Sequence, residues 1–141
     1  MNAHDVALIQ SSFAQVKPIS DQAAALFYGR LFEIAPEVKP LFQSDMTEQG
    51  RKLMGTLGYV VGGLSDLVTI LPAASALAKK HVGYGVQPDH YGPVGEALLW
   101  TLEKGLGDQW TPDTATAWAR AYSTLSGYMI SEAYDAAAMA E

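Results

Sequence analysis

His81 is the residue of this sequence whose type and position most clearly allow chemistry. It lies in the stretch ALAKKHVGYGV (residues 76–86), four residues after Leu77, and this spacing puts both side chains on one helix face. A histidine on an apolar helix face is either satisfied by a hydrogen bond or binds a metal through a neutral ring nitrogen. Tyr91 follows a glycine-rich turn, and its hydroxyl could reach the second ring nitrogen, as the outer partner of a metal-binding histidine does. Periodicity alone leaves both interpretations of His81 open.

Other polar side chains are candidates for the same site, and each also has an ordinary structural interpretation. Tyr28 shares a helix face with Phe27, which is typical of a core residue with a polar tip. Gln49 lies near the start of an expected helix, where solvent is its usual environment. The pair Lys79 and Lys80 is typical of a solvated face, although a cation beside an acidic cofactor group would look identical in sequence.

Most conventional catalytic sites find no support. The sequence contains no cysteine, so disulfides, thiolate metal sites and cysteine nucleophiles are excluded. His4 and His90 lack a partner three or four residues away that would make a zinc pair. No nucleophile elbow, phosphate-binding glycine loop or paired-carboxylate site is present, and hydrolase and kinase functions are therefore disfavoured.

Apolar residues recur with helical spacing along nearly the whole chain, which predicts an all-α fold. Capping residues and prolines give the expected limits of seven or eight helices. The expected helices run from Asn2 (cap, with Asp5) to near Lys17, from Ser20 to before Pro36, over PEVKPLF, from Asp45 (cap) to Gly62, over 64–70, from Pro72 to Gly83, from Asp89 (cap) through Leu102, and from Thr111 (cap) with Pro112 to beyond Met129. Short helices broken by prolines cannot span an up-and-down bundle, so we expect steep crossings with irregular space between the helices.

Composition limits the class of protein and its partners. The 141 residues, 49% of them hydrophobic, suffice for one core, and we expect a single domain over residues 1–141. Lys+Arg 9 against Asp+Glu 15 gives a net charge of -6, which argues against a nucleic-acid partner. The N-terminus has no signal-peptide pattern, and no apolar run is long enough to span a membrane. We therefore expect a soluble, cytoplasmic protein.

Six motifs occur in a characteristic order: FYGRLF, PEVKPLF, EQGRKLM, LAKKHVGYGV, HYGPVG and AWARAY. In this order the chain resembles the globins, most closely the bacterial single-domain haemoglobins and the haem domains of flavohaemoglobins. The stretch RKLMGTLGYVVGGLSDL also resembles neuroglobin. The resemblance extends from about Val6 to Glu132. It implies a globin fold of seven to eight helices in a three-over-three arrangement around haem b.

The resemblance also implies roles for the residues that would hold the haem. His81 matches the proximal iron ligand, and Phe42 matches the phenylalanine that packs against the porphyrin ring. Leu77 would pack on the proximal face of the haem. Lys80 matches a position close to the haem propionates.

On the opposite side, the resemblance implies an open ligand site. Tyr28 matches the distal tyrosine of bacterial haemoglobins, Gln49 takes the place of the distal histidine of many animal globins, and Leu53 matches the apolar residue above the iron. Glutamine is a poor iron ligand, so the sixth iron position should remain open to O₂, NO or CO. Hydrogen bonds from Tyr28 and Gln49 to bound O₂ would slow its release and give high affinity.

The proximal network of bacterial haemoglobins adds a tyrosine and a glutamate that give the histidine more anionic character. Tyr91 matches this tyrosine. The carboxylate, counted from Tyr122, falls on Ala133, and Glu132 precedes it by one residue, which is about 100° of helix rotation. Either a helix irregularity restores the contact of Glu132 or this residue lies on the surface.

Two functions from different classes follow from the resemblance. The first is a haem protein that binds or stores O₂. The alternative is an enzyme, a nitric oxide dioxygenase; because the 141 residues leave no room for FAD or NAD domains, we expect such an activity to use a separate reductase. A globin fold without haem is the third possibility, and the presence of both His81 and Phe42 argues against it.

Overall fold

The computed structural model describes residues 2–42, 46–83 and 90–131, and this part of the chain is helical, with no β-strand. The described residues form six α-helices, together with short 3-10 helices at three of the connections. The α-helices are α1 (Ala3–Val16), α2 (Ser20–Ile34), α3 (Met46–Gly62), α4 (Leu67–Gly83), α5 (Tyr91–Leu106) and α6 (Pro112–Ile130). The 3-10 helices are η1 (Lys17–Ile19), η2 (Pro36–Leu41) and η4 (Gly107–Gln109). The prediction of an all-α protein is confirmed.

The predicted helix count was slightly too high, and the difference lies around Pro72. We expected one short helix over residues 64–70 and another that begins at Pro72. Instead, α4 begins at Leu67 and continues through Pro72, its sixth residue, to Gly83. Proline lacks only its own N–H donor and disturbs the turn before it. Close to a helix start, this disturbance does not end the helix.

Most predicted helix limits agree with the structure. Asn2 and Asp5 form the expected capping box at the start of α1, with the Asn2 side chain accepting from the Asp5 N–H at 2.9 Å. Thr111 caps α6 by accepting from the Thr114 N–H at 3.1 Å, and Pro112 occupies the first turn. The predicted caps Asp45 and Asp89 lie outside the described residues.

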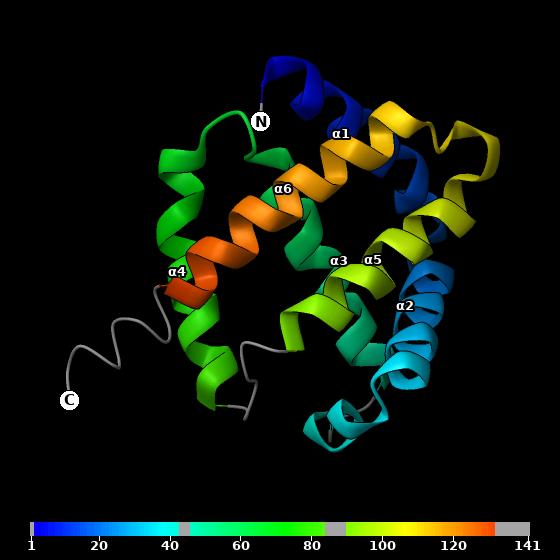
Figure 1. Ribbon diagram of the computed structural model, residues 1–141, viewed down its shortest axis with the longest axis vertical. Coiled ribbons are helices and arrows are strands. Elements are labelled where there is room, and N and C mark those ends of the chain that lie inside the picture. Colours follow the sequence, from blue (N-terminus) through cyan, green and yellow to red (C-terminus); the bar gives the residue numbers. More distant parts are fainter. Residues whose placement is uncertain (1, 43–45, 84–89, 132–141) are drawn as a thin grey trace.

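The helices pack in the three-over-three arrangement that the resemblance predicted. Helices α2 and α5 form the most extensive pair, α1 lies against α6, and α2 lies against α3 (Figure 1). Helix α4 packs chiefly against α6, whereas α3 packs against α2 and α1. Among the described residues, α3 and α4 therefore pack mainly against different helices. These two helices carry most of the residues of the predicted site.

A buried interface between α1 and α6 holds the two layers together. Trp118 of α6 donates from Nε1 to Oγ of Ser12 at 2.8 Å, and its ring centroid lies 6.5 Å from that of Phe13. Ile9 and Val16 of α1 are essentially inaccessible to solvent. No described helix is both long and apolar enough to cross a membrane.

Candidate functional site

His81 lies in the last turn of α4 and is half-buried. Its Nδ1 lies 2.7 Å from the carbonyl oxygen of Leu77, one turn earlier. A carbonyl oxygen only accepts, so Nδ1 must carry the proton. In a neutral imidazole this leaves the lone pair on Nε2, which is the tautomer suited to metal binding. The backbone of α4 therefore fixes the orientation and the tautomer of the His81 ring.

Tyr28 lies on α2 inside a cluster of aromatic rings. Its centroid is 4.9 Å from that of Phe27, 6.0 Å from that of Phe32 and 5.3 Å from that of Phe42. Phe42 follows η2, and its ring also meets Phe32 edge to face at 5.5 Å. Because rings on several sides fix the phenol, the hydroxyl of Tyr28 has one defined direction.

Gln49 of α3 is the polar partner of Tyr28. Burial raises the pKa of the Tyr28 hydroxyl above its ordinary value, and the hydrogen bond with the Gln49 side chain opposes part of this rise. A phenol with its ordinary pKa of about 10 is already protonated at neutral pH, and burial acts in the same direction, so the Tyr28 hydroxyl is a donor there. The two residues that the resemblance placed on the distal side are thus in direct contact, although they are far apart in sequence.

The apolar residues of the predicted site are only partly buried. Leu53, one turn after Gln49 on α3, packs against the main core with its side chain only half-buried. Phe42 and Leu77 are likewise half-buried. A half-exposed set of large apolar side chains, together with one histidine of suitable tautomer, fits the chemistry of a flat apolar group such as a porphyrin.

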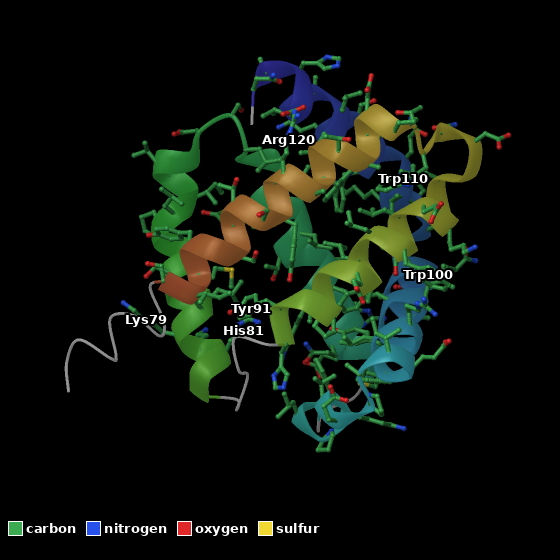
Figure 2. All side chains as sticks on the ribbon, viewed as in Figure 1. Lys79, His81, Tyr91, Trp100, Trp110 and Arg120 are labelled. Carbon is green, nitrogen blue, oxygen red and sulfur yellow. The ribbon has the colours of Figure 1, made fainter. Side chains whose placement is uncertain are left out.

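Tyr91 is the first residue of α5 and is buried. Its carbonyl oxygen accepts a hydrogen bond from the Tyr122 hydroxyl of α6. Burial raises the pKa of Tyr122, and the neighbouring Tyr91 adds to the rise. In the view of Figure 2, Tyr91 and His81 occupy the same region, between α4 and the start of α5. The hydrogen bond from the Tyr91 hydroxyl to His81 stays a prediction.

The remaining predicted residues are less closely associated with this region. Lys80 is exposed at the end of α4, and Lys79 points away from His81 in Figure 2. Glu132 lies outside the described residues, so its part in the proximal network stays a prediction. A surface cleft of about 460 Å³ lies between the end of α3 and the start of α4 and contains none of the predicted residues.

Sequence reasoning missed two features of the site. Phe32 packs against both Tyr28 and Phe42, and its position four residues after Tyr28 was a usable signal. The contact of Tyr122 with Tyr91 was not predicted, because this hydrogen bond spans 31 residues. No local pattern indicates such a contact.

The comparisons with known proteins agree with this architecture. The family profile of the globins matches residues 25–129. The chain belongs to the globin family, and membership in this family supports haem binding.

A similar protein is the flavohemoprotein of Rhodopirellula baltica, which is 34% identical over 107 residues. The alignment covers 74% of this chain and 26% of that protein. The chain thus spans about a quarter of the length of this curated relative. The expected similarity to bacterial globins is confirmed.

Proposed function

We propose that this chain forms a haem globin domain that binds O₂, NO and CO reversibly, with His81 as the iron ligand of haem b. The observation that carries the proposal is the short contact of 2.7 Å between His81 Nδ1 and the Leu77 carbonyl. It selects the tautomer with a lone pair on Nε2. Family membership over residues 25–129 supports the same role.

Haem held by one histidine supplies an open iron position at which a diatomic gas can bind. On the distal side, the Tyr28 hydroxyl and the Gln49 amide are donors for a ligand that has gained negative charge. With haem bound, the apolar side chains of Leu53 and Phe42 would help to keep water from these donors, which would strengthen each hydrogen bond. We propose O₂ binding or storage with slow release as the result.

On the proximal side, Leu77 would pack against bound haem, and Lys80 would pair with a propionate. The Tyr91 hydroxyl would donate to His81. Glu132 would add negative charge to the same network. The buried position of Tyr91 and the anchoring of its carbonyl by Tyr122 support this arrangement.

The iron ligand is tested by the absorption spectrum of the protein expressed with haem available. We expect a strong Soret band from the wild type and loss of most of it in His81→Ala, because the iron loses its protein ligand. His4→Ala is the matched control, since His4 is exposed on α1, and it should retain the band. A colourless wild type would contradict haem binding altogether.

Nitric oxide dioxygenase activity with a separate reductase is the second candidate. The observation in its favour is the 34% identity to a flavohemoprotein. Stopped-flow mixing of the O₂-loaded protein with NO, followed by turnover with an added reductase, separates the two functions. Sustained NO consumption with each reduction cycle supports the enzyme, whereas a single fast oxidation does not, because O₂-loaded globins in general react with NO.

Partners and location follow the same proposal. The partners are diatomic gases and, for the enzyme, a reductase. Nucleic acid and membrane surfaces are not proposed as partners, since the net charge of -6 opposes binding to phosphate. The proposed location is the cytoplasm.

A further inference from the structure

Helices α2 and α3 approach each other closely where two small residues meet. Ala24 of α2 and Gly50 of α3 are both buried. A Cβ built on Gly50 would lie 2.9 Å from the Cβ of Ala24. Neither atom is the end of a flexible side chain, so the added methyl group could be accommodated only if the two helices moved.

This contact lies next to the distal pair. Tyr28 follows Ala24 by four residues, about one turn or 6 Å along α2, and Gln49 directly precedes Gly50 on α3. The hydrogen bond between Tyr28 and Gln49 therefore joins the same two helices, about one turn of α2 from the contact of Ala24 with Gly50.

We propose that Gly50, together with Ala24, positions Gln49 against Tyr28 and thereby sets the rate at which O₂ leaves the site. This inference rests on the proposed function. Carbon atoms in contact stay about 3.5–4.0 Å apart, so an alanine at position 50 would push α3 from α2 by up to about 1 Å. Hydrogen bonds weaken steeply over such a change, and Gln49 would lose its alignment with Tyr28 and with the ligand.

The first test compares Gly50→Ala with Gly55→Ala in the haem-loaded protein. Gly55 lies on the same helix and is exposed, with nothing within 4 Å of an added Cβ. Both changes add the same methyl group and the same helix propensity. We expect Gly50→Ala to raise the O₂ dissociation rate by about three- to tenfold, as expected when a charge-assisted hydrogen bond is weakened. Gly55→Ala should leave the rate unchanged.

Two further readouts separate positioning from a loss of general stability. The C–O stretching frequency of the CO complex reports donors beside the ligand, and it should rise in Gly50→Ala but not in Gly55→Ala. The urea midpoint of unfolding should fall in Gly50→Ala and rise in Gly55→Ala, because only the first change creates a steric conflict.

The decisive variant exchanges the two residues, as Ala24→Gly with Gly50→Ala. The exchange moves the methyl group across the contact and removes the conflict, so the O₂ dissociation rate, the C–O frequency and the urea midpoint should return close to wild-type values. It also tests the inference if Gly50→Ala alone does not fold. In a Tyr28→Phe background, Gly50→Ala should add little to the rate.

An unchanged O₂ rate in folded Gly50→Ala, or an exchange variant that remains altered, would overturn the inference. Failure of the proposed function has a different signature, since the wild type would then lack the Soret band or Tyr28→Phe would leave the O₂ rate unchanged. If Tyr28→Phe changes the rate and Gly50→Ala does not, the positioning role alone is wrong.

Discussion

Tyr28 shows how much a single side chain of this site depends on its neighbours. Its ring is fixed by the aromatic contacts with Phe27, Phe32 and Phe42, and its hydroxyl meets the Gln49 side chain. Its hydroxyl is protonated at neutral pH, as an ordinary tyrosine is, and burial raises its pKa further. A fixed and protonated phenol is what slow ligand release requires.

Tyr28→Phe should therefore accelerate the release of O₂ from the haem-loaded protein. A hydrogen bond to a group with negative charge contributes about 1.5–3 kcal/mol, so the dissociation rate should rise by roughly ten- to a hundredfold. Stopped-flow displacement of O₂ by CO measures the rate. Tyr59→Phe is the control, because Tyr59 is 55% exposed and lies in the surface cleft between α3 and α4. Equal rates in wild type and Tyr28→Phe would remove Tyr28 from the distal role.

Much of the residue-scale site was predictable, but its contacts were not. Helical spacing put His81 and Leu77 on one face, and the motifs indicated Tyr28 and Gln49. The hydrogen bond between Tyr28 and Gln49 depends on how α2 crosses α3, and no local pattern encodes this crossing. The close approach of Gly50 to Ala24 depends on the same crossing and was not predicted.

At the scale of elements, the start of α5 is held by α6. The Tyr122 hydroxyl donates to the Tyr91 carbonyl, one of the first-turn groups of α5. A Cβ on Gly95 would lie 2.5 Å from the Tyr122 ring, so Gly95 permits this close packing. The segment that carries Tyr91 thus takes its position from a residue of another helix.

Tyr122→Phe should lower the free energy of unfolding by about 1–2 kcal/mol, because it leaves the Tyr91 carbonyl of a buried residue without this donor. Urea unfolding at pH 7 measures the change. Tyr128→Phe on the same helix is a comparison variant for removal of a phenol hydroxyl from a half-buried position. Identical unfolding midpoints for wild type and Tyr122→Phe would contradict the anchoring role.

The same hydroxyl predicts a dependence on alkaline pH. The folded-state pKa of Tyr122 is raised by burial, so its contribution to stability is complete below the ordinary tyrosine pKa of about 10 and is lost as pH rises above it. Tyr122→Phe should lose less stability than the wild type above about pH 10. Parallel losses in both proteins would contradict the prediction.

Helix limits were predictable where a capping side chain or a first-turn proline marks them. Asn2, Thr111 and Pro112 act locally and lie where the patterns indicated. Pro72 misled the prediction, because proline restricts the preceding turn without showing how many residues of helix come before it.

For the whole molecule, the α1–α6 interface joins the N-terminal helix to the last described helix. Asp5 is buried, its side chain accepts from the Asn2 N–H in the capping box of α1, and its Oδ2 lies 3.3 Å from Nη1 of Arg120. Burial works to raise the pKa of Asp5, but the Asn2 backbone N–H and Arg120 outweigh it and hold the pKa below its ordinary value. The charged form of Asp5 therefore stabilises the fold.

Because the folded-state pKa of Asp5 is lowered, its contribution is present above the ordinary aspartate pKa of about 4 and is lost as pH falls below it. Asp5→Asn should be less stable than the wild type at pH 7, and the difference should shrink at about pH 3. Urea unfolding at both pH values measures it, with exposed Asp21→Asn as the control. A difference that is the same at both pH values would contradict the ion pair.

The overall arrangement was predictable only through the order of its motifs. Periodicity and prolines excluded a long bundle, and the motif order then implied the three-over-three arrangement. The hydrogen bond from Trp118 to Ser12 spans 106 residues, so the interface that joins both ends of the fold could not be derived from local patterns. Composition indicated that the chain can form one core, but it did not indicate which residues contact each other in that core.

The absorption spectrum of the ferrous protein, recorded first without gas and then with O₂, tests the central proposal most directly. With His81 on one side and only Tyr28 and Gln49 on the other, the ferrous protein should be five-coordinate. It should convert to an O₂-bound spectrum and return when O₂ is removed. A six-coordinate ferrous spectrum without gas, or no haem spectrum at all, would contradict a single-histidine site that is open to O₂.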